Sequence, residues 1–301
     1  MNITIYGTRG SYPSPSDRGR NFYTDKYGGH TTSLLVEPQG DELIHVDLGS
    51  GSTQAGIDLI NRGTYSKEGK EHTVLITHFH ADHTEGTPYL KPLYDPRNTF
   101  HIHGNADPRV VEELLGTRQN KAYFPVAYQA VSTGDAVPFM MAKKIHYSLN
   151  GKEISKSIDI TFEQTNHPGG CVAYKFNENG KIFAFSGDHE FGVQSIDDKL
   201  RDFYKNSQII LHDCQYLPEE RNPAQYGLKG IPKAGWGHAD FKQLIDFMLK
   251  VQPEVLILTH HDPEHDDKFI DEMHAKAQEY ARVVGLESKI VMATPGMKLI
   301  L

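Results

Sequence analysis

The sequence predicts an α/β protein in which two β-sheets pack face to face and helices cover the outside. Many short apolar stretches have the length of buried strands, and fewer stretches have helical periodicity. Residues that can bind metal follow the ends of several of these strands. The predicted strands are 3–6, 33–36, 43–47, 74–77, 100–103, 158–164, 172–176, 182–186, 209–212 and 255–259, and the predicted helices are 55–61, 109–115, 241–250 and 268–281.

The length and charge of the chain limit the functions that it can have. No Pro/Gly/Ser-rich linker or low-complexity tract divides the 301 residues, so we predict a single domain over residues 1–301. The formal net charge is −8 and no basic block occurs. We expect no large nucleic-acid surface, because such surfaces need clustered Lys and Arg, but a small anionic ligand held by metal ions fits this charge.

Cysteine usage and hydropathy predict the compartment. The two cysteines, Cys171 and Cys214, lie far apart and form no CxxC pair, which indicates a reducing compartment and no structural zinc ribbon. The N-terminus reads as a strand, and no uncharged apolar run has membrane-spanning length. We therefore expect a cytoplasmic protein that does not bind a membrane.

The densest group of metal-binding side chains is the motif His-Phe-His-Ala-Asp-His at 78–83. It follows the predicted strand 74–77, so its side chains start from a rigid element. His78 and His80 are two residues apart and project to the same side of an extended chain. Asp82 and His83 fall where the chain turns, because the next five residues cannot sustain a long helix. This arrangement suits two adjacent metal ions.

Three more candidate ligands follow other predicted strands. His167 precedes Pro-Gly-Gly, which leaves room around its imidazole, and Asp188 and His260 each come directly after an apolar run. Asp213 also ends a strand. Because sites are built on loops at strand ends, we expect these residues to contribute to one functional site.

The HxHxDH motif, followed by separate His, Asp and His residues at strand ends, resembles the metallo-β-lactamase superfamily. The resemblance runs from Gly7 almost to the C-terminus. It implies an αββα four-layer sandwich, with two mixed sheets face to face and helices outside.

The resemblance also implies a ligand set for two divalent metal ions. His78, His80 and His167 would hold one ion, Asp82, His83 and His260 the other, and Asp188 would bridge both. Asp82 would also take part in catalysis, and Asp47 would hydrogen-bond the ligands from behind. Imidazole and carboxylate ligands suit Zn²⁺ first, with Mn²⁺ or Fe²⁺ as alternatives. Such ions lower the pKa of bound water towards about 7.

Two residues in the C-terminal third indicate a branch of the superfamily. His238 resembles a histidine of ribonuclease Z and its phosphodiesterase relatives that contacts the scissile phosphate and protonates the leaving oxygen. Asp213 stands where these relatives carry Glu after His. We expect Asp213 to orient His238 and raise its pKa, so that His238 acts as an acid near neutral pH.

Departures from the relatives narrow the expected substrate. The segment between His167 and Asp188 has room for two strands and a turn, and not for the long basic arm with which bacterial ribonuclease Z grips transfer RNA. Cys171 and Cys214 cannot form the cysteine-rich zinc site of the phosphoribosyl cyclic phosphodiesterases. The stretches 7–13 and 27–31 resemble small-molecule phosphodiesterases. Candidate substrate contacts in and near the polar, aromatic loop between them are Arg18, Arg20, Phe22, Tyr23, Tyr27 and His30.

We therefore predict a dinuclear metal phosphodiesterase, acting in a homodimer on a small, cyclic phosphodiester, with a cyclic nucleotide as the first choice. A thioester or lactam hydrolase with the same metals is one alternative, and a non-catalytic metal-dependent binding protein is another. His238 alternatively caps the following helix or faces solvent, and the loop between residues 18 and 27 is alternatively a solvated connection. The acidic run 262–267 is expected to be a solvated loop that caps the next helix.

Overall fold

The computed structural model describes residues 1–63, 69–95, 97–118, 120, 122, 124, 125, 144–149, 154, 155 and 157–301. It divides into two compact units, each of which combines segments distant in sequence. Unit 1 contains Met1–Gly7, His30–Ser157 and Gly296–Ile300, and unit 2 contains Thr8–Gly29, Ile158–Pro295 and Leu301. The two units are described separately below, and the single domain stays a prediction.

The sheet of unit 1 has seven strands in the order β13-β1-β2-β3-β4-β5-β6. The strands are β1 Asn2–Gly7, β2 Ser33–Glu37, β3 Leu43–Val46, β4 Glu71–Ile76, β5 Thr99–Gly104, β6 Lys144–Leu149 and β13 Lys298–Ile300. Pairs from β13 to β3 are antiparallel and pairs from β3 to β6 are parallel. Since β3 and β4 are parallel neighbours, the residues that follow them meet at the same edge of this sheet.

Apolar side chains fix the helices of unit 1 on this sheet. The helices are α1 Ser52–Asn61, the single turn α2 Ala81–Thr84 and α3 Pro108–Arg118. Ala55 and Leu59 of α1 pack in a buried cluster with Leu35 of β2, and Val111 of α3 packs with Phe100 of β5. Burying a side chain of this size contributes about 1.5–3 kcal/mol, so this packing holds the strand ends that carry the HxHxDH motif.

The sheet of unit 2 has six strands in the order β12-β11-β10-β9-β8-β7. The strands are β7 Asp159–Thr165, β8 Cys171–Glu178, β9 Lys181–Phe185, β10 Ile209–Asp213, β11 Val255–Thr259 and β12 Lys289–Met292. The strands from β9 to β12 are parallel, while β7, β8 and β9 alternate in direction. The C-terminal ends of β7, β9, β10 and β11 therefore share one edge of this sheet.

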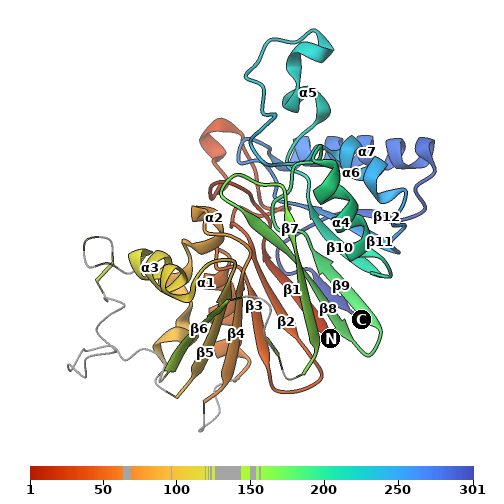
Figure 1. The fold of residues 1–301 in the computed structure, drawn as a ribbon. Coiled ribbons are helices and arrows are strands. Elements are labelled where there is room, and N and C mark those ends of the chain that lie inside the picture. The colour runs from red at the N-terminus through yellow and green to blue at the C-terminus, as the bar shows by residue number, and fades with distance from the viewer. Residues whose placement is uncertain are drawn as a thin grey trace. The chain divides into compact units, whose positions relative to one another are not determined.

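Three amphipathic helices lie along the sheet of unit 2 (Figure 1). They are α4 Gln194–Tyr204, α6 Phe241–Met248 and α7 Asp267–Val284, and the short α5 Pro218–Arg221 stands away from the strands. Leu200 of α4, Leu244 of α6 and Met273 of α7 belong to one buried cluster with Leu256 of β11. This core keeps the loops after the parallel strands in place.

Each of the ten predicted strands and four predicted helices overlaps an observed element. The predicted strand 43–47 was one residue too long. Strand β3 ends at Val46, and Asp47 leaves the strand with φ +57°. The strands β6, β12 and β13 and the helices α4 and α5 were not predicted. In the described ranges, none of the helices combines the length and apolar composition that crossing a bilayer requires. Cytoplasmic location stays a prediction.

Candidate metal centre

Unit 1 gathers the four polar residues of the HxHxDH motif directly after β4. His78 is buried and His80 is exposed, and the centroids of their rings are 4.5 Å apart. The His83 ring centroid lies 4.2 Å from that of His78. Asp82 is buried, and its Oδ2 lies 3.4 Å from His83 Nε2. The predicted turn is confirmed, since α2 spans one turn only.

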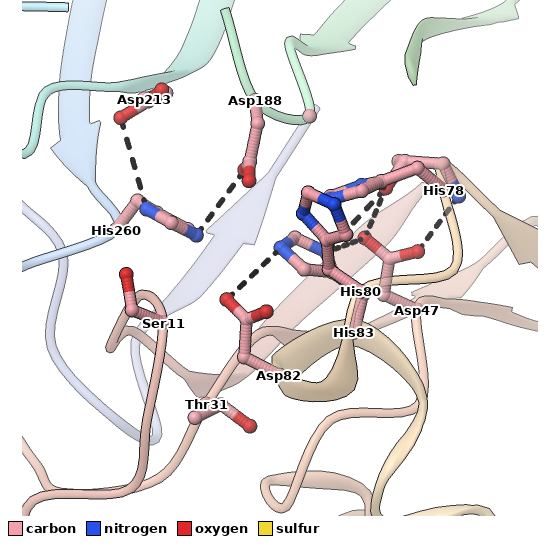
Figure 2. Close-up of polar contacts among 12 residues, drawn as sticks. Ser11, Thr31, Asp47, His78, His80, Asp82, His83, Asp188, Asp213 and His260 are labelled. Carbon is pink, nitrogen blue, oxygen red and sulfur yellow. Dashed lines mark hydrogen bonds and ion pairs between the residues drawn. The ribbon is translucent and has the colours of Figure 1, made fainter. Parts of the chain in front are cut away.

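Asp47 lies next to this group, and Figure 2 shows its carboxylate facing His83. Its carboxylate accepts hydrogen bonds from Thr77 N and Thr77 Oγ1, both at 2.8 Å, and from His83 Nδ1 at 2.7 Å. We therefore place a proton on Nδ1 of His83, which leaves its Nε2 as an electron-pair donor. Burial raises the pKa of the Asp47 carboxyl, and the contacts with His83 and Thr77 oppose this shift.

The backbone near Asp47 approaches α2 so closely that glycine is required. A Cβ on Gly49 would lie 2.2 Å from the carbonyl oxygen of Asp82. Leu48 N donates to the His83 carbonyl at 2.7 Å. The stretch after β3 and the turn after β4 are thus held together by backbone contacts as well as by the carboxylate of Asp47.

Unit 2 gathers a second group at the shared edge of its sheet. Asp188, Asp213, His238 and His260 are all buried, and one ligand atom of each lies within 4.8 Å of the others. His260 Nε2 is 3.2 Å from Asp188 Oδ1, and Figure 2 shows the His260 ring between Asp188 and Asp213. His167 Nε2 lies 3.8 Å from Asp188 Oδ2. The predicted meeting of these strand ends is observed within this unit.

Hydrogen bonds on Nδ1 set the orientation of the three histidines of unit 2. His167 Nδ1 donates to the Gly237 carbonyl at 3.0 Å. His260 Nδ1 lies 3.1 Å from Gln215 Oε1, and His238 Nδ1 lies 2.9 Å from Asp213 Oδ2. With a proton on each Nδ1, all three Nε2 atoms remain available as ligands or for proton transfer.

The donor set in each unit fits divalent metal ions. Unit 1 offers three imidazoles and one carboxylate between His78 and His83, and unit 2 offers two imidazoles around one buried carboxylate. Ring nitrogens and carboxylate oxygens are the usual ligands of zinc and of similar ions. Bonds that fix Nδ1 of a ligating histidine, as at His83, His167 and His260, are typical of metal sites.

The predicted substrate contacts lie outside these groups of residues. Arg18 and Arg20 are exposed on a short 3-10 turn, and Arg20 forms an exposed ion pair with Asp17. Tyr23 is 40% exposed. His30, in unit 1, is exposed, and its Nδ1 lies 3.2 Å from Ser50 Oγ. Contact with substrate stays a prediction for Arg18, Arg20, Tyr23 and His30.

One expectation for unit 2 was wrong, and one candidate contact of the N-terminal loop is buried. Tyr27 is 2% exposed and its hydroxyl donates to Asp271. The run 262–267 is not fully solvated, since Asp262 and His265 are buried and their carbonyls accept hydrogen bonds from Arg9. The cap at its end is confirmed, because Asp266 accepts from Phe269 N.

The sequence did not single out Thr77, Gln215 or Glu190. Thr77 links Asp47 to the HxHxDH motif, and Gln215 contacts His260. Glu190 binds the loop that precedes His238. A usable signal exists for all three, because each lies within two residues of a predicted site residue or adjoins the motif.

Comparison with known proteins identifies the family. The description "Beta-lactamase superfamily domain" matches residues 55–261, more than half of the chain, and the chain belongs to this family. The predicted fold class and the resemblance to the ribonuclease Z-like branch are confirmed. The protein is a metal-dependent hydrolase of this superfamily.

Three similar proteins cover nearly the whole chain. Ribonuclease Z of Pyrococcus horikoshii is 21% identical over 306 residues, which include 89% of this chain and 88% of that protein. Unliganded yeast PDE1 has a TM-score of 0.65 and 17% identity, covering 100% of this chain and 99% of its own. Zn(2+)-bound PqqB from Methylobacterium extorquens has a TM-score of 0.66 and 14% identity, covering 100% of both chains.

Proposed function

We propose that this protein is a dinuclear metal-dependent phosphodiesterase that hydrolyses a small phosphodiester, with a cyclic nucleotide as the first candidate, to a phosphomonoester. The observation that carries this proposal is the buried pair His238–Asp213, with 2.9 Å between Nδ1 and Oδ2, beside Asp188 and His260. The alkoxide that leaves a phosphodiester needs a proton, and a histidine held by a carboxylate supplies one. A thioester, in contrast, releases a thiolate, which leaves without a proton from the enzyme.

The proposed metal ligands are His78, His80, Asp82 and His83 from unit 1 and His167, Asp188 and His260 from unit 2. When bound, two divalent ions would bind phosphate oxygens, offset negative charge in the transition state and lower the pKa of water, with Zn²⁺ first and Mn²⁺ or Fe²⁺ as alternatives. Asp47 keeps His83 in the tautomer that such a site needs.

His238 acts on the leaving oxygen. Asp213 accepts a hydrogen bond from Nδ1–H, which keeps that proton on the ring. The second proton of the charged imidazole is on Nε2, and this is the proton that is transferred. The oxygen of water forms a bond to phosphorus, the bond from phosphorus to the leaving oxygen breaks, and that oxygen takes the Nε2 proton. The water molecule loses a proton to solvent, and His238 takes up a proton from solvent, so the site returns to its starting state.

Charge and topology support a small substrate. The formal net charge is −8, and β8 and β9 form a plain antiparallel hairpin in the segment where a basic arm would have to be inserted. We assign the contacts beyond the phosphate to Arg18, Arg20, Tyr23 and His30. The proposal includes a homodimer, which light scattering of purified protein tests directly.

A substrate panel tests this function. Protein loaded with Zn²⁺ or with Mn²⁺ is incubated with 3′,5′- and 2′,3′-cyclic nucleotides, bis(p-nitrophenyl) phosphate, a structured RNA, a thioester and a lactam. We expect turnover of at least one small diester and no cleavage of the RNA. Turnover of only the thioester or lactam, or stoichiometric nucleotide binding without product, would refute the proposal in favour of a different hydrolase or a binding protein.

A further inference from the structure

Glu190 is a buried carboxylate that belongs to none of the groups assigned above. It lies two residues after Asp188 and is 7% exposed. A charged group at such a site is costly unless hydrogen bonds compensate for the lost solvation. The partners of Glu190 therefore indicate what the carboxylate does.

Among the residues that the structure describes, the Glu190 carboxylate bonds to three residues of the segment 221–237, namely Arg221, Gly235 and Gly237. Gly235 N lies 2.8 Å from Oε1 and 2.9 Å from Oε2, and Gly237 N lies 2.9 Å from Oε2. Arg221 Nη2 donates to Oε1 at 2.5 Å and neutralises its charge. One carboxylate thus holds the backbone on both sides of Trp236, and we call residues 235–237 the clamped loop.

The clamped loop contacts one proposed ligand and carries the proposed acid. The Gly237 carbonyl accepts a hydrogen bond from His167 Nδ1, and His238 is the next residue. Gly237 has φ +94°, and a Cβ there would lie 2.2 Å from His167 Nδ1, so only glycine fits. A shift of this backbone would move the imidazoles of His167 and His238 together.

The same loop forms part of a cavity of about 340 Å³ within unit 2. His167, Pro168, Phe191, Gly235 and Gly237 line it together with Glu190. The carboxylate therefore lies in the wall of the space next to His167, with its oxygens turned to backbone amides and to Arg221 rather than left for a ligand.

We propose that Glu190 is a positioning residue, which acts through the clamped loop to set the imidazole of His167 for metal binding and that of His238 for proton transfer. This inference rests on the proposed function, because it takes His167 as a ligand. Groups that orient metal ligands typically change metal affinity or activity by about 10- to 100-fold when they are removed.

The chain offers a direct reporter of the clamped loop. Trp236 is its sole tryptophan, it stands between the two clamped glycines, and it is 52% exposed. Tryptophan emission and its quenching by iodide therefore report the state of this loop and of no other segment. A carboxylate that only stabilised the fold would leave the native emission unchanged.

The test compares wild type with Glu190→Gln, and uses Glu219→Gln as the matched control. Glu219 lies on α5, two residues before Arg221, and its carboxylate contacts Lys276 at 3.2 Å instead of the loop. Calorimetry with Zn²⁺ gives the metal affinity, and iodide quenching gives the exposure of Trp236. We expect Glu190→Gln to weaken Zn²⁺ binding by about 10- to 100-fold and to increase quenching, and Glu219→Gln to change neither.

The outcomes separate this inference from the function on which it rests. If wild-type protein binds no Zn²⁺ at all, the proposed function fails. If wild type binds Zn²⁺ and folded Glu190→Gln has the same affinity and the same quenching, Glu190 has no positioning role. If Glu190→Gln does not fold, Glu190→Asp decides by the same comparison, because it keeps the charge beside Arg221 but is too short to reach both glycine amides.

Discussion

His238 is the residue whose loss distinguishes phosphodiester cleavage from other chemistry of this fold. We expect His238→Ala to retain its metal and to lose about 10²- to 10⁴-fold in kcat, because the leaving oxygen then departs without a proton from the enzyme. Steady-state kinetics on a cyclic nucleotide, with metal content measured on the same sample, gives the answer. His274→Ala is the control, since His274 lies on α7 and its Nε2 contacts the Ile290 carbonyl. An unchanged kcat in His238→Ala would show that His238 is not the acid that protonates the leaving oxygen.

The role proposed for Asp47 is to act on the metal site through His83. Asp47→Asn keeps the size of the side chain, and Asn tolerates the positive φ of +57° at this position. The amide lacks the negative charge and one acceptor, so His83 Nδ1 and Thr77 are no longer all satisfied. We expect Zn²⁺ affinity to fall by about 10- to 100-fold, measured by competition with a chelating dye. Wild-type affinity in this variant would contradict the assigned role.

At the scale of elements, the start of α7 depends on one side chain. Asp266 accepts a hydrogen bond from Phe269 N at 2.8 Å, and the helix packs through Ile270 and Met273. Asp266→Ala should lower the free energy of unfolding by about 1 kcal/mol and leave kcat unchanged. Urea denaturation measures this loss. Glu279→Gln, at an exposed position of the same helix, serves as the comparison, and equal stability of the two variants would argue against the cap.

The elements that the sequence predicted are those with long apolar runs. Strand β11 is nearly continuous in apolar residues and β4 ends in the apolar run Val74–Ile76, so both patterns are unambiguous. Helix α4 was missed because its buried residues are few, Asp197, Leu200 and Tyr204, among charged neighbours. The edge strands β12 and β13 have only four and three residues, too few to show a period.

At the scale of the molecule, buried neutral histidines should make stability depend on pH. Burial lowers the pKa of His45 and of His103 from 6.5 to about 4. The unfolded chain takes up these protons near pH 6.5 and the folded chain only near pH 4. The free energy of unfolding therefore falls as the pH drops from about 6.5 to about 4, by up to about 1.4 kcal/mol per pH unit for each histidine.

Urea denaturation of metal-free protein across this pH range measures the dependence. In His103→Gln one titrating group is lost, so the slope should be smaller than in wild type. The same slope in both proteins would mean that the low pKa of His103 does not contribute to acid sensitivity.

The site could be predicted from the sequence where its residues share a motif or follow recognisable strands. His78 to His83 are adjacent in sequence, and His167, Asp188 and His260 each follow an apolar run. Glu190 and Gln215 were missed because their partners, Gly237 and His260, lie far along the chain, and only the fold brings them into contact. The one local signal for these positions is proximity, since each lies two residues after a predicted site residue, Asp188 or Asp213.

The metal content of the purified protein tests the central claim most directly. Protein stripped with a chelator is dialysed against excess Zn²⁺ and, in a parallel sample, Mn²⁺, and elemental analysis then gives the ions retained per chain. Two ions per chain are expected, together with recovery of phosphodiesterase activity as they bind. Folded protein that never retains more than one ion of either kind would contradict the dinuclear site.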